Sequence, residues 1–249
     1  MSGHSKWATI KHKKGAADAA RAKTFAKLIR LVEVAAREGG SDATTNASLR
    51  AAVTKARDAS VPMDTIDRAI KRGSGELEGV QYEQMMYEGY SAGGVAMLVD
   101  ALTDNRNRTG AEVRSIFSKN GGALAEPGAV AWQFERKGVI LVPNSIGEDD
   151  LMALALDAGA DDLIPAGDMW QLTCAPSDLT ALRAALDEAG VAYESAETTM
   201  LPQNSVPVTD ESVAKQVLRM LDALEDHDDV QNVYANFDIS DEMFEMVGA

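Results

Sequence analysis

The spacing of the apolar residues changes abruptly near residue 79, and this change constrains the fold more than any other feature of the chain. Before this point, apolar side chains recur with the period of an α-helix. After it, the chain contains short segments in which apolar and polar residues alternate, as in β-strands, and these segments are separated by helical ones. The Gly-rich residues 73–79 separate the two parts and are typical of a linker. The chain is therefore predicted to be an α+β multidomain protein whose first domain, residues 1–79, is helical.

Three helices are expected in this first domain. The first spans residues 15–38, and its apolar side is formed by Phe25, Ile29, Val32 and Ala36. The second begins after Asn46 or Ser48, which are both good N-cap residues. The third has Asp64 as its predicted N-cap and ends at Gly73. Three short helices with short connections indicate a small bundle.

The rest of the chain predicts two α/β domains, one inserted in the other. Residues 80–135 begin with a hairpin and a helix, and residues 129–134 are expected to return as a strand. Residues 136–202 have the element order βαββαβ, which is typical of a ferredoxin-like domain. The helix and strand within residues 203–249 have no strand partners of their own. They are therefore predicted to return to the first sheet, which makes residues 136–202 the insertion.

Charge is distributed very unevenly along the chain. Residues 1–72 contain 15 Lys and Arg against 7 Asp and Glu, a net charge of +8, whereas the rest of the chain carries −23. Such an asymmetry indicates a nucleic acid or another anionic surface as the partner of the basic segment. The net charge of the whole chain, −15, would indicate the opposite. The alternative is that the asymmetry only reflects drift or solubility.

The first fourteen residues are basic, contain no acid and lack helical periodicity, which predicts an extended arm. Its predicted nucleic-acid-binding residues are Lys6, Trp7, Lys11, His12, Lys13 and Lys14. The lysines suit phosphates, and the indole offers a face on which an unpaired base can stack. The alternative is a solubilising tail, although such a tail has little use for an indole.

The helices of the first domain continue this basic surface. The first helix contributes Lys23, Lys27 and Arg30, and a second basic edge is formed by Arg68, Lys71 and Arg72. We interpret both groups as nucleic-acid-binding. The alternative for either group is a solvated helix face.

A second candidate site lies between a predicted strand and a predicted helix, in the segment Asn105–Arg108. Arg106 and Arg108, together with the backbone N–H groups at the helix start, predict an anion-binding site. Thr109 and Glu112 have the spacing of a capping box for this helix. The alternative is that both arginines form ion pairs with neighbouring carboxylates.

The sequence offers little for catalysis, so no enzyme, cofactor or metal is predicted. Its only histidines are His4, His12 and His227, and it has no Gly-rich phosphate loop and no metalloprotease or hydrolase motif. The acidic residues 225–229 are interpreted as a charged helix end rather than a metal site. The single cysteine, Cys174, excludes a disulfide scaffold and a cysteine-based zinc site. Without a membrane span or signal-peptide core, the chain is predicted to be cytoplasmic.

Several segments together resemble the YebC/PmpR family. They are SGHSKWATIKHKKGAADAARAK at residues 2–23, Lys71–Gly73, Met86–Tyr90, Leu102–Thr109, Lys119–Gly122, Arg136–Val139 and Asp229–Tyr234. The resemblance covers essentially the whole chain and implies three domains, a helical one and two of α/β type. It also implies a cytoplasmic, DNA-binding regulator of transcription. Mitochondrial relatives are translational activators, and some bacterial members are linked to ribosomes stalled on proline-rich stretches.

The residues themselves leave the kind of nucleic acid open. No helix-turn-helix pattern with a major-groove reading helix is evident. A basic arm with an indole suits an irregular RNA surface at least as well as duplex DNA. The prediction is therefore a non-enzymatic regulator that binds DNA or ribosomal RNA, with the ribosome as a further partner and no membrane. The rival is an enzyme acting on RNA that uses Asn105–Arg108 as an anion site.

Overall fold

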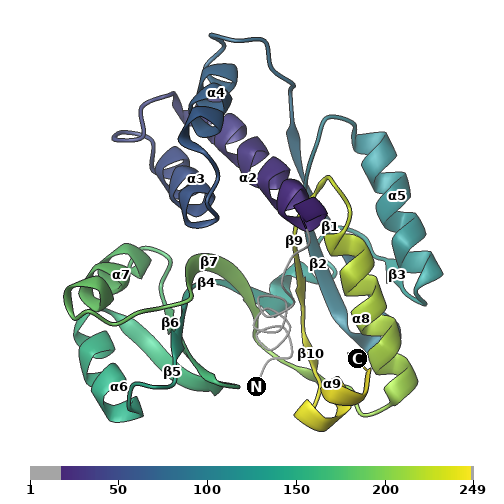
Figure 1. Cartoon of the computed structure of the whole chain (residues 1–249). Helices are drawn as coiled ribbons and strands as arrows, with labels where there is room; N and C mark the ends of the chain where they lie inside the picture. Colours follow the sequence, from purple (N-terminus) through teal and green to yellow (C-terminus); the bar gives the residue numbers. More distant parts are fainter. Residues whose placement is uncertain (1–17, 248–249) are drawn as a thin grey trace.

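The computed structural model of the chain describes residues 18–247 (Figure 1). It contains a helical domain followed by two α/β units with separate sheets. The predicted fold class is confirmed, including the ferredoxin-like unit inserted in the other α/β unit. The exact domain boundaries stay a prediction. Within the described residues, no helix combines the length and the apolar character that crossing a membrane requires.

The helical domain consists of α2 (Asp18–Gly39), α3 (Ala47–Asp58) and α4 (Met63–Gly73). These helices pack around fully buried Val32, Leu49 and Ile66. Asn46 is the N-cap of α3, as expected, and its side-chain oxygen accepts a 3.0 Å hydrogen bond from the Leu49 N–H.

The N-cap expected for the third helix is wrong by two residues. Pro62 takes that position in α4, and its φ of −59° is already suited to a helix start. Asp64 lies inside the first turn, where a carboxylate is favoured by the helix dipole.

The first α/β unit has a four-stranded sheet in the order β3-β1-β2-β9. The strands are β1 (Glu83–Tyr90), β2 (Ala96–Thr103), β3 (Ala123–Leu124) and β9 (Val230–Ala235). One face is covered by α5 (Arg106–Lys119) and α8 (Glu211–Glu225), which bury Phe117 and Leu221 against Val99. Because β9 pairs antiparallel with β2, the chain returns to this sheet after the inserted unit.

Smaller elements complete this unit. They are the short helical turns η1 (Ala92–Gly94) and η2 (Ala131–Gln133), the parallel strand pair β8 (Val206–Pro207) and β10 (Phe237–Asp238), and α9 (Asp241–Val247).

The strand expected over residues 129–134 is not formed, and a buried carboxylate explains why. The Glu88 carboxylate accepts hydrogen bonds from the N–H groups of Gly128, Val130 and Ala131, at 2.6–2.8 Å. These donors are thus satisfied by a side chain instead of a strand ladder. The segment folds into η2, and the next strand begins only at Phe134.

The inserted unit has the ferredoxin-like order that the sequence predicts. Its elements are β4 (Phe134–Pro143), α6 (Glu148–Asp157), β5 (Ala160–Ala166), β6 (Met169–Cys174), α7 (Leu179–Glu188) and β7 (Ser195–Pro202). The strands lie in the order β5-β6-β4-β7, and every neighbouring pair is antiparallel. Both helices pack on one face, where Leu151 and Leu182 contact the core around Ile140 and Leu172.

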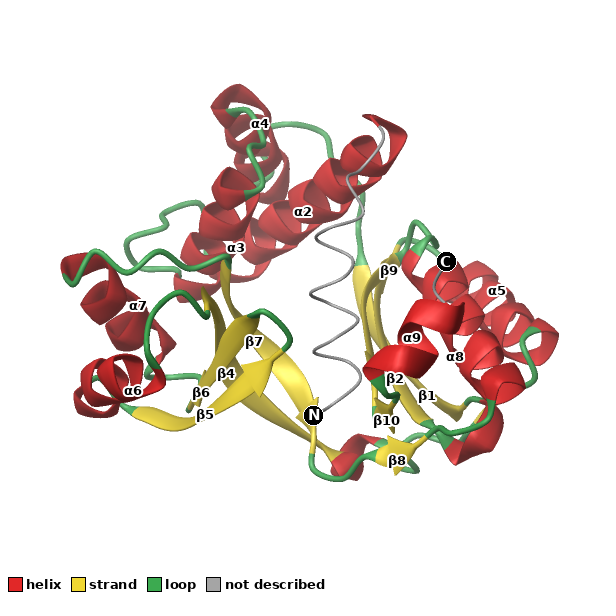
Figure 2. Cartoon of the chain, turned by 60° about the horizontal axis from the view of Figure 1, so that its bottom comes forward, coloured by secondary structure: helices red, strands yellow, loops and turns green. Residues whose placement is uncertain are grey.

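The two sheets lie on either side of the molecule, and the helical domain bridges them (Figure 2). An apolar cluster that contains Leu98, Phe134 and Met200 joins the two α/β units. In the described part of the chain, no apolar cluster extends from the helical domain into either of them. The helical domain is therefore attached mainly through polar contacts and through the segment that follows α4.

Candidate nucleic-acid interface

Three cations of α2 lie on one side of the helix, as their spacing predicts. Lys23, Lys27 and Arg30 are four and three residues apart, which places them on neighbouring turns of one face. We call these three residues the basic stripe. The structure brings them together, but it places them against residues 225–229, which are the last residue of α8 and its connection to β9 (Figure 1). We call residues 225–229 the acidic turn.

Each cation of the basic stripe has a partner on the acidic turn. Lys23 Nζ lies 2.9 Å from Asp226 Oδ1, and this contact raises the pKa of Lys23 and lowers that of Asp226. Lys27 Nζ donates a 2.6 Å hydrogen bond to the carbonyl oxygen of Glu225. Arg30 Nη1 donates to the carbonyl of Asp228 and to Asp229 Oδ1, at 2.9 and 3.0 Å. Nucleic-acid binding by these cations stays a prediction. It requires that the acidic turn release the side chains of the basic stripe.

Asp229 is the buried centre of this contact, with 4% of its surface exposed. Its Oδ2 accepts hydrogen bonds from Arg108 Nη2 at 2.6 Å, Thr109 Oγ1 at 2.7 Å and Thr103 Oγ1 at 3.3 Å. Burial alone would raise the pKa of Asp229, but the bonds from Arg108 and Thr109 and the charge of Arg30 hold it below its usual range. The carboxylate is therefore ionised at neutral pH and binds both the helical domain and α5.

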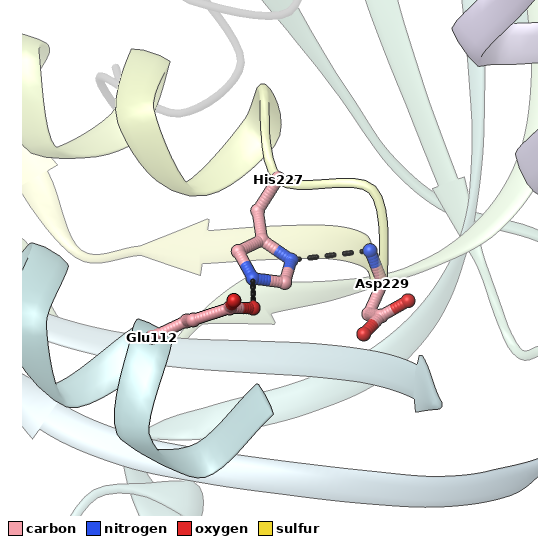
Figure 3. Close-up of side chains that lie close together, drawn as sticks. All are labelled: Glu112, His227 and Asp229. Carbon is pink, nitrogen blue, oxygen red and sulfur yellow. Dashed lines mark hydrogen bonds and ion pairs between the residues drawn. The ribbon is translucent and has the colours of Figure 1, made fainter. Parts of the chain in front are cut away.

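His227 and Glu112 continue the network on the outer side of Asp229 (Figure 3). His227 Nδ1 accepts a 3.1 Å hydrogen bond from the Asp229 N–H, so the ring proton lies on Nε2, which faces Glu112 Oε2 at 2.9 Å. The three side chains offer ligand atoms within 4.8 Å of one another. However, the Asp229 oxygens already accept bonds from two guanidinium groups. A divalent cation would have to displace Arg30 and Arg108, so these residues fit an ion-pair network better than a metal site.

A mixed-charge cleft of about 730 Å³ lies between α2, α5 and the acidic turn. Its basic lining residues are Lys23, Arg30, Arg108 and Lys119. Its acidic lining residues are Asp104, Glu112, Asp226, Asp228 and Asp229. Opposite charges alternate at short range, so the cleft is not a basic groove for a phosphate chain while the acidic turn occupies it.

The structure places the predicted anion site of Asn105–Arg108 at the rim of this cleft. Arg108 pairs with Asp104 at 2.8 Å as well as with Asp229, and these two carboxylates raise its pKa. Arg106 Nε lies 3.5 Å from Glu83 Oε2, with both side chains largely exposed. Both arginines thus have the carboxylate partners that the alternative interpretation expects, and anion binding by them stays a prediction.

The capping box expected at Thr109 is wrong. Asn105 is the N-cap of α5, and its side chain accepts a 3.1 Å hydrogen bond from the Arg108 N–H. Thr109 lies within the helix and is fully buried, and its hydroxyl binds Asp229. The same residue types that signal a helix start therefore serve here to hold a buried carboxylate.

The basic residues of α4 have mixed roles. Arg68 Nη2 forms an exposed i,i+4 ion pair with Asp64 at 2.6 Å. Arg72 Nε lies 3.0 Å from Oε2 of the buried Glu33 on α2, so it helps to hold the helical bundle together. Lys71 is exposed on the same helix. The predicted second basic edge is therefore only partly directed to solvent.

The arm residues Lys6, Trp7, Lys11, His12, Lys13 and Lys14 lie outside the described residues, and their predicted roles stay predictions. The central residue of this network, Asp229, is not predicted from the sequence. Its segment, Asp229–Tyr234, supports the family resemblance, but nothing local marks this carboxylate as the partner of α2. The sequence signal for this contact is the opposite charge of the basic stripe and the acidic turn. Many other acidic segments of this chain carry the same charge, so this signal alone does not identify the partner.

Comparison with known proteins identifies the family. The description "TACO1/YebC protein N-terminal domain" matches residues 5–76, and "TACO1/YebC second and third domain" matches residues 82–237. The chain belongs to the TACO1/YebC family. The resemblance that the sequence motifs indicate is therefore confirmed. The Asp229 network joins parts of the chain that match different domains of this family, because Arg30 lies in the first match and Arg108 and Asp229 lie in the second.

Relatives in this family match the whole chain. A "probable transcriptional regulatory protein" of Rubrobacter xylanophilus is 57% identical over 251 residues and covers 100% of both chains. One of Syntrophobacter fumaroxidans is 55% identical over 248 residues, 99% of this chain and 100% of its own. The crystal structure of a conserved hypothetical protein from Aquifex aeolicus has a TM-score of 0.81 at 46% identity, covering 90% of this chain and 93% of that one. The names of the curated relatives indicate regulation of transcription.

Proposed function

We propose that this protein is a cytoplasmic, non-enzymatic regulator of gene expression that binds nucleic acid through its N-terminal domain. The observation that carries the proposal is the separation of charge, with +8 on residues 1–72 and −23 on the rest. Phosphate chains attract the first segment and repel the second, so the N-terminal domain approaches the nucleic acid first. Relatives named probable transcriptional regulatory proteins support a regulatory role.

We further propose structured RNA, above all on the ribosome, as the preferred ligand. The arm combines lysines for phosphates with Trp7 for stacking, and stacking requires bases that are not paired in a duplex. Duplex DNA is the rival ligand. The two differ in a measurable way, because a duplex-reading protein depends on one DNA sequence and little on an indole in the arm.

Crosslinking in cells, followed by sequencing of the bound DNA and RNA, tests this proposal. The wild type is compared with a variant in which Lys6, Lys11, Lys13 and Lys14 are changed to Gln. The control carries the changes Arg114→Gln, Arg136→Gln, Lys215→Gln and Arg219→Gln, which remove the same charge from the two α/β units, away from the cleft. We expect RNA reads that disappear in the arm variant and persist in the control. Reads that concentrate on a few duplex DNA sites in all three proteins would contradict the RNA proposal.

An enzyme acting on RNA is the second candidate, because His227 is hydrogen-bonded to Glu112 in the same cleft as Arg108, and a histidine is the most common general acid or base. The hydrogen bonding of His227 speaks against it. Its Nδ1 accepts the Asp229 N–H and its Nε2 faces Glu112, so both ring nitrogens are engaged. Incubation of labelled RNA with wild type and His227→Asn distinguishes the two candidates. New RNA ends that form with the wild type and not with the variant would favour the enzyme.

A further inference from the structure

In the contact between the basic stripe and the acidic turn, lysine and arginine side chains bind oxygen atoms of the same protein. They would bind the phosphate oxygens of a nucleic acid through the same donor atoms. We propose that the acidic turn is a built-in competitor, which occupies the basic stripe until a phosphate chain displaces it. The inference rests on the proposed function and concerns the regulation of the same site. It predicts a closed state, with Lys23, Lys27 and Arg30 on the acidic turn, and an open state with these cations on phosphates.

The donors and acceptors in the contact support this competition. Lys Nζ and Arg Nη atoms are the usual donors to phosphate oxygens. In the structure they bind carboxylate and carbonyl oxygens of the acidic turn at 2.6–3.0 Å. A phosphate chain offers acceptors of the same kind at a higher charge density. The two partners cannot use the same donors at once, so binding of one weakens binding of the other.

The closed state is held weakly enough to open. The side chains of Lys23 and Asp226 are 43% and 75% exposed, and an ion pair of this kind is screened by salt and contributes little. The Arg30 contact with Asp229 is more buried, but Asp229 keeps its bonds to Arg108 and Thr109 when Arg30 leaves. Opening therefore leaves no buried carboxylate without a positive partner.

The attachment of the helical domain also permits movement. Its other ion pairs, Lys55 with Glu197 at 2.7 Å and Arg183 with Asp58 at 3.4 Å, join it to the ferredoxin-like unit. These side chains are 29–57% exposed. Because the described residues form no apolar cluster across either boundary, the helical domain is not fixed by hydrophobic burial. In the pairs of Lys23, Arg30 and Lys55 the helical domain supplies the cation, so a polyanion can replace the carboxylate, whereas in the pair with Arg183 it supplies the carboxylate.

Removal of charge from the acidic turn provides the first test. The variant Asp226→Asn/Asp228→Asn is compared with Asp149→Asn/Asp157→Asn, which removes the same charge from exposed positions of α6. The probe is a fluorescein-labelled single-stranded oligouridylate, titrated into each full-length protein at low salt. We expect the Kd of the acidic-turn variant to fall by about three- to tenfold, and that of the control to fall much less. Equal changes in both variants would show that only overall charge matters and would overturn the proposal.

A distance measurement provides the second test. Spin labels are attached to Arg57→Cys on α3 and Arg114→Cys on α5, both exposed positions, while the native Cys174 is buried. We expect the distance distribution between the labels to change when the oligouridylate saturates the protein, and the acidic-turn variant to show part of this change without RNA. If the distance distribution stays unchanged when the oligouridylate saturates the protein, the proposal that the acidic turn competes with phosphate is overturned. The proposed nucleic-acid binding is not affected by that result. Absence of binding in every protein would instead overturn the proposed function, and the competitor with it.

Discussion

Arg30 donates a 3.0 Å hydrogen bond to the carboxylate of Asp229, although 199 positions separate the two residues in the chain. The same carboxylate accepts a 2.6 Å bond from Arg108 on α5. One buried side chain thus links the helical domain, α5 and the start of β9. This link determines where the basic stripe lies and therefore which of its cations are available to a ligand.

The substitution Asp229→Asn is expected to lower the free energy of unfolding by about 2 kcal/mol, because the partly exposed Arg30 and Arg108 lose the buried carboxylate that they share, while Arg108 keeps its pair with Asp104. Chemical denaturation followed by circular dichroism measures this change. Asp228→Asn is the control, since the neighbouring Asp228 is exposed and only its carbonyl oxygen contacts Arg30. Equal stability of the two variants would show that the network around Asp229 is not a structural centre.

The substitution Glu88→Gln is expected to destabilise the protein by about 2 kcal/mol at pH 7, because one of its three backbone donors then faces an N–H₂ group. Burial would raise the pKa of Glu88, but the hydrogen bonds from Gly128, Val130 and Ala131 lower it below the usual value. A carboxylate with a lowered pKa in the folded state stabilises the protein above its unfolded-state pKa, about 4.3. This stabilisation is lost as the pH falls through the folded-state pKa.

The difference in stability between wild type and Glu88→Gln should therefore be constant near neutral pH and should shrink as the pH falls below about 4. Urea denaturation at a series of pH values measures it. A difference that grows on acidification would contradict the assignment of Glu88 as an ionised acceptor.

Much of the fold could be predicted from the sequence because the signals are local. The helical period of residues 15–38, the cap at Asn46 and the order βαββαβ each depend on neighbouring residues. Even the return of β9 to β2 could be inferred, because a strand without a partner must join an existing sheet.

The errors arise where a distant residue changes what a local pattern means. Residues 129–134 have a strand pattern, but the buried Glu88 carboxylate takes their N–H groups. Thr109 and Glu112 have the spacing of a capping box, but Asp229 binds the Thr109 hydroxyl inside the helix. The basic stripe was predicted from its spacing, whereas its acidic partner depends on the packing of the two domains. Such contacts have no signature within a short window of sequence.

The substitution Trp7→Ala is expected to weaken binding of RNA with unpaired bases by about 1–3 kcal/mol, because a base loses the face on which it stacks. Binding of plain duplex DNA should change little. Fluorescence titration with a single-stranded RNA and a duplex of equal length measures both effects. An equal loss on the two ligands would mean that Trp7 supports the fold or the protein's charge rather than contacting a base.

The central claim is that the N-terminal basic residues bind phosphates, and the salt dependence of RNA affinity tests it most directly. The measurement is the slope of log affinity against log salt for structured ribosomal RNA. It compares the wild type, the variant with Lys6, Lys11, Lys13 and Lys14 changed to Gln, and the control that lacks four cations of the two α/β units. The account predicts a slope that is shallower by about 0.7 to 0.9 for each lost phosphate contact in the arm variant, and an unchanged slope in the control. Equal slopes in all three proteins, or tight sequence-selective binding of duplex DNA that survives loss of the arm lysines, would contradict it.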